Sequence, residues 1–93
     1  MTNFTVRVEL HNADSDDYEE LHEKMEGKGF KRTILNGDGT KYQLPDAEYN
    51  YSGNITRADV LEKAYSTANS VKKDPAVLVT ESAGRTWRGL DKS

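Results

Sequence analysis

The fold of this chain is decided by the stretch Asn3-Phe4-Thr5-Val6-Arg7-Val8-Glu9-Leu10-His11, because its alternate residues differ in chemistry. Phe4 and the aliphatic residues at positions 6, 8 and 10 point one way, and Thr5 and the ionisable residues at 7, 9 and 11 point the other. Strict alternation over this length is typical of a β-strand with one buried face. We therefore expect one face of the strand to be covered and the other to stay polar.

Length and composition indicate one small α+β domain. A chain of 93 residues is too short for two cores, and with 34% hydrophobic and 31% charged residues it suits a thin, two-layer architecture. The absence of cysteine excludes disulfides and thiolate metal sites. Neither a signal peptide nor a membrane-spanning segment is recognisable, so we expect a cytoplasmic protein that does not bind a membrane.

Two helices are expected. The first covers about residues 15–26, with Ser15 or Asp16 as its cap and with Tyr18, Leu21, His22 and Met25 at helical spacing. The second covers about residues 57–72, with Thr56 as its cap and Asp59 at the third helical position. Each helix has an apolar stripe that would pack on the covered face of the sheet.

Four further stretches read as strands and one as a hairpin turn. Residues 30–35 and 40–44 flank Asn36-Gly37-Asp38-Gly39, a strong hairpin signal, and residues 47–52 and 76–80 form two more strands. Strand, helix, strand, strand, helix, strand is the order of a ferredoxin-like βαββαβ sandwich, with a four-stranded antiparallel sheet and both helices on one face. We expect this domain to span residues 1–82, followed by a C-terminal tail at 83–93.

Charge is unevenly distributed along the chain. The formal net charge is −3, yet residues 14–26 hold seven acidic residues against one lysine, so the remainder carries a net positive charge. RNA would therefore avoid the first helix and approach the sheet or the tail, with an affinity that weakens with salt.

The pattern also resembles a known family. The strand at residues 3–10, the segment Asp17-Tyr18-Glu19-Glu20-Leu21-His22 leading to Gly29-Phe30, and Tyr42-Gln43-Leu44-Pro45 before Tyr49-Asn50-Tyr51 resemble the GhoS-type endoribonuclease antitoxins. These are small bacterial ferredoxin-like proteins, related in fold to a nuclease subunit of CRISPR adaptation complexes, and the best-known member cleaves a toxin messenger in a type V toxin–antitoxin pair. The resemblance implies a sequence-specific endoribonuclease whose partner is a toxin messenger RNA.

One departure from the CRISPR relatives concerns metal. Those relatives place an aspartate at the end of the first strand, whereas this chain has Leu10-His11-Asn12 there. We therefore expect no metal and no other cofactor. A partial likeness to a calcium loop, which starts at Asn12, fails because Asp17 replaces the glycine that such a loop requires.

The open face of the first strand carries our predicted catalytic residues, Arg7, Glu9 and His11. They supply a phosphate-binding cation, a carboxylate and a group that titrates near neutrality, as activation of a ribose 2′-hydroxyl requires. A solvated sheet face shows the same alternation and is the simpler reading. His22 lies on the stripe facing the sheet, so we read it as a half-buried core residue partnered by the helix's own acids or a backbone carbonyl.

RNA binding is assigned to four cations, which are Arg32, Lys41, Arg85 and Arg88. Lys41, Arg85 and Arg88 are interleaved with aromatic residues that can stack on bases, namely Tyr42, Tyr49, Tyr51 and Trp87. The alternation of Tyr49 and Tyr51 with Glu48 and Asn50 favours the core for both tyrosines. Trp87 is expected to dock on its own domain or on a second subunit.

Two classes of function remain open at this point. The first is an RNA-cleaving antitoxin. The second is a non-catalytic module, either a protein-binding regulator that uses the acidic first helix or a sheet-to-sheet homodimer.

Overall fold

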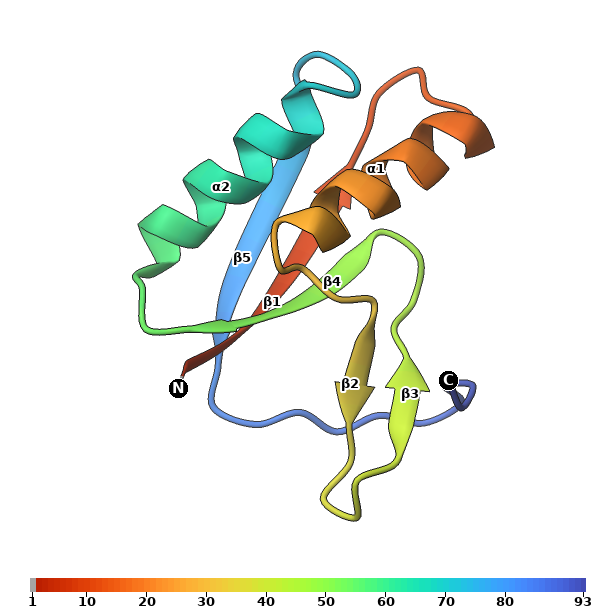
Figure 1. The fold of residues 1–93 in the computed structure, drawn as a ribbon, viewed down its shortest axis with the longest axis vertical. Coiled ribbons are helices and arrows are strands. Elements are labelled where there is room, and N and C mark those ends of the chain that lie inside the picture. Colours follow the sequence, from red (N-terminus) through yellow and green to blue (C-terminus); the bar gives the residue numbers. More distant parts are fainter. Residues whose placement is uncertain (1) are drawn as a thin grey trace.

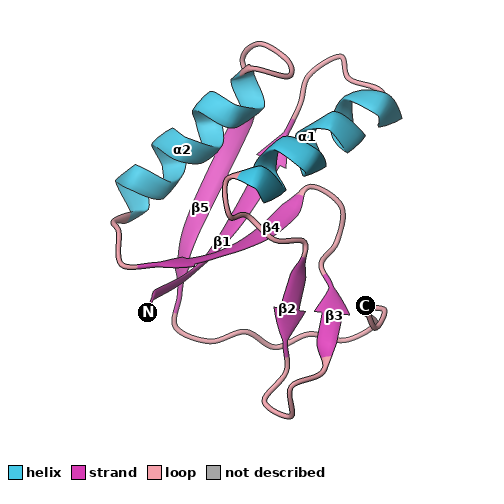
Figure 2. Ribbon diagram, viewed as in Figure 1, coloured by secondary structure: helices cyan, strands magenta, loops and turns pink. Residues whose placement is uncertain are grey.

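A computed structural model describes residues 2–93, and Figure 1 shows their arrangement. The elements follow in the order β1 (Thr2–Glu9), α1 (Ser15–Gly27), β2 (Thr33–Leu35), β3 (Lys41–Gln43), β4 (Glu48–Gly53), α2 (Arg57–Asn69) and β5 (Ala76–Ser82). The chain is therefore an α+β protein, as its composition and patterning predict. Its strands form a three-stranded sheet and a separate two-stranded one (Figure 2).

The main sheet has the order β4-β1-β5, and both neighbours run antiparallel to β1. The register places Val6 opposite Tyr49 on one side and opposite Val79 on the other. The predicted first strand thus lies in the centre of the sheet, and Val6 at its middle is flanked by an apolar residue of each neighbouring strand.

Both helices cover the same face of this sheet, and the core lies between the two layers. Phe4, Val6 and Val8 are fully buried there and Leu10 is nearly so, which confirms the covered face expected from the alternation. The helices contribute the apolar side chains Leu21, Met25, Val60, Ala64 and Ala68 to the same cluster. Tyr18 ties α1 to the end of β1, because its hydroxyl accepts a hydrogen bond from the Leu10 N–H at 3.0 Å.

The start of α1 differs by one or two residues from our expectation of a cap at Ser15 or Asp16. Asp14 is the N-cap: its carboxylate accepts from the Asp17 N–H at 3.0 Å, and the Asp17 carboxylate accepts from the Asp14 N–H at 3.1 Å. A carboxylate three residues after Asp14 can close this reciprocal box just as Glu19 would have closed one on Asp16. The box on α2 is the predicted one, between Thr56 and Asp59.

α2 ends earlier in the chain than the sequence predicts. The helix ends at Asn69 rather than near residue 72, because the Ser70 hydroxyl donates to the Thr67 carbonyl and the Asn69 side chain accepts from the Asp74 N–H. These side chains offer the backbone local partners that compete with another helical turn. Lys72 consequently lies beyond the helix, with its ammonium 3.8 Å from the Asp17 carboxylate of α1.

The sequence predicts a strand of the main sheet at residues 30–35, but this stretch does not form one. Lys31 pairs with Asn50 through two backbone hydrogen bonds, of 2.8 and 2.7 Å, and this isolated bridge is the only ladder contact between the β2 region and β4 in residues 2–93. Beyond it the chain leaves the sheet, and β2 pairs instead with β3 across the Asn36–Gly39 turn, which confirms the hairpin. The turn is closed by the Gly39 N–H donating to the Asn36 carbonyl, with Gly39 at φ +87°.

Residues 83–93, predicted as a tail, lie against the hairpin. The Gln43 N–H donates to the Asp91 carbonyl at 2.8 Å, and the Ser93 N–H donates to the Lys41 carbonyl at 3.0 Å. Ile34 and Leu44 are buried in the hairpin, outside the main core. The hairpin and the C-terminal segment thus pack against each other as a small unit at the β4 side of the main sheet (Figure 1).

Candidate functional site

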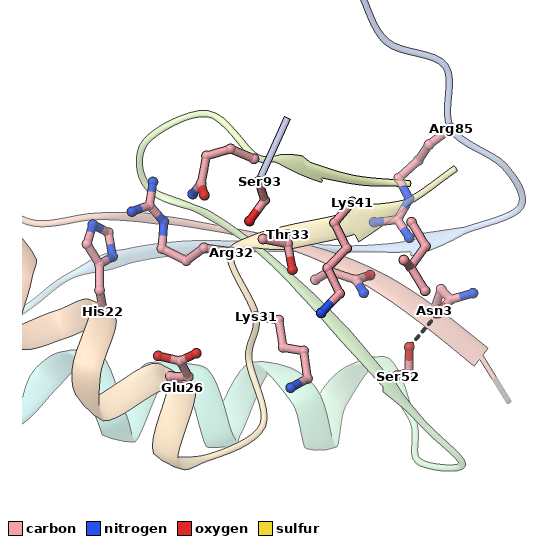
Figure 3. A pocket seen from close by; sticks show the side chains of 13 residues that line it. Asn3, His22, Glu26, Lys31, Arg32, Thr33, Lys41, Ser52, Arg85 and Ser93 are labelled. Atoms are coloured by element: carbon pink, nitrogen blue, oxygen red, sulfur yellow. Dashed lines mark hydrogen bonds between the residues drawn. The ribbon is translucent and has the colours of Figure 1, made fainter. Parts of the chain in front are cut away.

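A groove of about 850 Å³ lies between α1, the hairpin and β4, and we call it the basic groove. Its lining includes polar side chains from β1, α1, the β2–β3 region, β4 and the C-terminal segment, namely Asn3, His22, Glu26, Lys31, Arg32, Thr33, Lys41, Gln43, Asn50, Ser52, Arg85 and Ser93. Figure 3 shows His22 and Glu26 of α1 at one end and Arg85 at the other. Four of these side chains are cationic and one is acidic.

The local fold explains why the cations converge. The bridge to Asn50 holds Lys31 at the β4 edge, and the hairpin begins directly after it. Side chains along β2 and β3 point alternately to the two faces of the hairpin, and Leu35 lies opposite Lys41. Ile34 is buried on one face, so Lys41 is presented on the other. Arg85 comes from the far end of the chain, and its guanidinium reaches to 3.5 Å from the Thr5 hydroxyl of β1.

The cations differ in how far they are already paired. Arg32 already has a partner: its Nη2 lies 3.1 Å from the Asp46 carboxylate, while its buried Nε has no hydrogen-bond partner within residues 2–93. Lys31, Lys41 and Arg85 form no ion pair with residues 2–93. Partial burial lowers the pKa of the Arg85 guanidinium from its ordinary value, but an arginine remains charged at neutral pH. Three cations of the groove are therefore available to an anionic ligand.

His22 lies at the α1 end of the groove, bonded to a core tyrosine. Its Nδ1 is 2.5 Å from the hydroxyl of Tyr49, whose ring is fully buried on β4. Burial raises the pKa of Tyr49 well above its ordinary value, so the phenol keeps its proton and can donate it to Nδ1. In that arrangement the neutral imidazole carries its proton on Nε2, the nitrogen left for a ligand.

The surroundings of His22 favour this neutral form. Burial lowers the pKa of His22 and the Arg32 guanidinium lowers it further, while Asp46 and Glu19 oppose the shift. Our expectation of a half-buried residue is confirmed, but the partner is the Tyr49 hydroxyl rather than an acid of α1 or a backbone carbonyl. The pairing arises because α1 covers the sheet face on which Tyr49 of β4 lies, and the helix sequence alone does not show this.

The predicted catalytic residues lie away from the groove. Arg7 is paired with Glu48 of β4 at 3.7 Å, and Arg7 and Glu9 border a separate hollow of only about 150 Å³. His11 is exposed in the turn after β1 and does not line either of these hollows. At about 3.3 Å per residue, His11 lies roughly 26 Å along the chain from Asn3, where β1 enters the groove. A catalytic role for these three residues stays a prediction.

The predicted RNA-binding residues are better grouped. Arg32, Lys41 and Arg85 all line the basic groove, and Arg88 lines a neighbouring hollow that Arg85 also borders. Sequence reasoning did not include Lys31 or Glu26. The signal for Lys31 was its position beside Arg32 at the start of a predicted edge strand, and the signal for Glu26 was its spacing of four residues from His22, which places both on one helical face.

The two tyrosines of β4 lie in the core, as their alternation with Glu48 and Asn50 predicts. Tyr49 is fully buried, and Tyr51 packs against Phe30 with ring centroids 4.8 Å apart, so both belong to the core rather than to an open platform. Trp87 docks on its own domain, 5.6 Å from the Tyr42 ring.

Residues 2–93 contain no group of three or more histidine, aspartate or glutamate side chains placed to hold a metal ion. Within the same residues, neither helix has the length and apolar character needed to cross a membrane. Comparisons of the sequence with models of protein families and with curated proteins give no match.

Proposed function

We propose that this protein binds single-stranded RNA in the basic groove and cleaves it, acting as an endoribonuclease antitoxin on a toxin messenger. The observation that carries the proposal is the gathering of Lys31, Arg32, Lys41 and Arg85 around one hollow in a chain whose formal net charge is −3. Phosphate contacts supply most of the affinity of proteins for nucleic acids, and lysine and arginine make them.

The remaining lining of the groove suits RNA. Asn3, Gln43 and Ser52 present amide and hydroxyl groups beside the cations, and such groups bind ribose hydroxyls and base edges. The acidic residues of α1 are mostly exposed on the outside of the helix, and only Glu26 reaches the groove. The negative charge of the chain is thus kept largely away from the surface where a phosphate backbone would lie.

The order of elements supports the ferredoxin-like reading on which the family resemblance depends. β1 is central, β4 and β5 flank it, and Lys31 pairs with β4 at the place where that fold has its fourth strand. We propose that the chain is a variant of this fold in which the fourth strand is reduced to one bridge and its continuation forms the hairpin wall of the groove.

The groove contains the groups that cleavage requires. The 2′-oxygen attacks the adjacent phosphorus, the bond from phosphorus to the 5′-oxygen breaks, and the products are a 2′,3′-cyclic phosphate and a 5′-hydroxyl. Glu26 is placed to take the 2′ proton, and the leaving 5′-oxygen takes a proton from solvent. Nε2–H of His22 and the cations stabilise the charge on the phosphate oxygens.

RNA binding is tested by the anisotropy of a labelled single-stranded RNA at several salt concentrations. Three phosphate contacts, one for each cation of the groove that has no ion pair within residues 2–93, predict a slope of about −2 in the logarithm of affinity against the logarithm of salt, at ~0.7 per phosphate for single strands. Lys41→Ala should weaken binding and reduce the slope by about 0.7, whereas Lys73→Ala, outside the groove, should change neither. Equal effects of the two substitutions would refute the assignment.

Cleavage is tested with the same RNA and purified protein, with and without a chelator. Glu26→Gln should reduce the rate by roughly a hundredfold or more while leaving the affinity unchanged or improved. A wild-type protein that binds RNA without cutting it would remove the enzymatic part of the proposal. A protein that neither binds nor cuts RNA would favour the non-catalytic regulator instead.

A further inference from the structure

A second hollow, of about 410 Å³, adjoins the basic groove on the C-terminal segment, and we call it the Trp87 hollow. Its principal side chains are Tyr42, Arg85, Trp87 and Arg88. The Trp87 and Tyr42 rings lie 5.6 Å apart and are tilted by 57°, so the hollow combines two aromatic rings with two guanidinium groups. Aromatic rings and guanidinium planes are the surfaces on which unstacked nucleobases pack.

The Trp87 hollow is held in place by backbone contacts. Tyr42 of β3 pairs with Lys92, and the Gln43 N–H donates to the Asp91 carbonyl, so the segment after Trp87 is anchored to the hairpin. Gly89 adopts φ +82°, a conformation that glycine reaches without steric cost and that lets the chain turn back toward β3. The aromatic pair is thus already ordered without a ligand, which reduces the entropy lost on binding.

Arg85 lines both the basic groove and the Trp87 hollow. It also lines a further depression of about 300 Å³, together with Asn3, Leu35 and Trp87. Leu35 is 62% exposed and adds an apolar side chain to this depression. A nucleotide whose phosphate lies on Arg85 therefore has its base within reach of the Trp87 ring.

We propose that the Trp87 hollow is a nucleobase subsite, in which one base of a single-stranded RNA stacks on Trp87 while its phosphate contacts Arg85. This subsite rests on the proposed RNA binding in the basic groove and adds a second kind of contact to it. Phosphate contacts in the groove are indifferent to the base, whereas stacking in the hollow requires one.

The chain has a single tryptophan, so its fluorescence reports on this hollow alone. The probe is a short 2′-O-methyl oligoadenylate, which cannot be cleaved through the 2′-oxygen, compared with an abasic chain of the same length and charge. We expect the oligoadenylate to quench Trp87 emission and the abasic chain to bind more weakly without quenching. Trp87→Ala should weaken oligoadenylate binding roughly tenfold or more, and Trp87→Phe should retain most of the affinity.

The two proposals fail differently in this experiment. Binding that depends on Lys31 and Lys41, but leaves Trp87 emission unchanged and treats both probes alike, would overturn the subsite and leave the groove in place. Absence of binding by either probe would overturn both. Should Trp87→Ala fail to fold, as judged by circular dichroism, the comparison of the two probes on the wild-type protein still decides the question.

Discussion

The hydrogen bond between His22 and Tyr49 allows a quantitative test of how the site is built. Tyr49→Phe removes only the hydroxyl from a fully buried ring and leaves Nδ1 of His22 without its partner. A net hydrogen bond contributes about 0.5–1.5 kcal/mol to stability. His22 is half-buried, so water partly replaces the lost donor, and we expect a loss of about 1 kcal/mol, or ~4–8 °C in Tm for a chain of this size.

The same pair predicts a pH dependence. Because the pKa of His22 is lowered on folding, the unfolded chain binds more protons than the folded one between the two values. The free energy of unfolding should therefore fall as the pH is lowered through the ordinary histidine pKa of 6.5 toward the lower value in the folded protein. His22→Ala should remove this component of the pH profile, and His11→Ala, in an exposed turn, should leave it in place.

Urea unfolding of the wild type, Tyr49→Phe, His22→Ala and the double variant would measure both effects. The double-mutant cycle should give a coupling of about 1 kcal/mol, as contacting residues do. Tyr65→Phe is the matched control, because Tyr65 is an exposed residue of α2 and its substitution should change stability by less than ~0.5 kcal/mol. A Tyr49→Phe protein as stable as the wild type, with zero coupling, would refute the pairing and the tautomer inferred from it.

Two further predictions concern the backbone and catalysis. Gly29→Ala should destabilise the protein by about 1–2 kcal/mol in urea unfolding, because Gly29 has φ +94° and an added Cβ would lie 3.3 Å from the Tyr51 ring. The control is Gly27→Ala: this position has open space around it, so the substitution should be neutral or stabilising by up to ~1 kcal/mol. If the row on β1 carries cleavage, His11→Ala should slow it by roughly a hundredfold with folding intact, and a wild-type rate in that variant would leave only the groups of the basic groove.

The central part of this fold is determined by local pattern. Alternation along residues 3–11 identifies β1 and its buried face, and the box of Thr56 and Asp59 identifies the start of α2, because both depend on neighbours within a few residues. The same holds for the hairpin, since Asn36–Gly39 specifies the turn without help from the rest of the chain. The sequence also suggests Arg32, Lys41 and Arg85 as RNA-binding residues, but it does not show that their side chains lie around one groove.

Tertiary structure decided where those side chains meet. Lys31 bonds to Asn50 and the chain then leaves the sheet, where β2 pairs with β3 and β3 in turn pairs with residues 91–93. His22 acquires its partner from β4, 27 positions along the chain, and Arg85 reaches β1 from 80 positions away. Contacts of this range depend on the packing of whole layers, which is why no local pattern reveals the basic groove or the pairing of His22 with Tyr49.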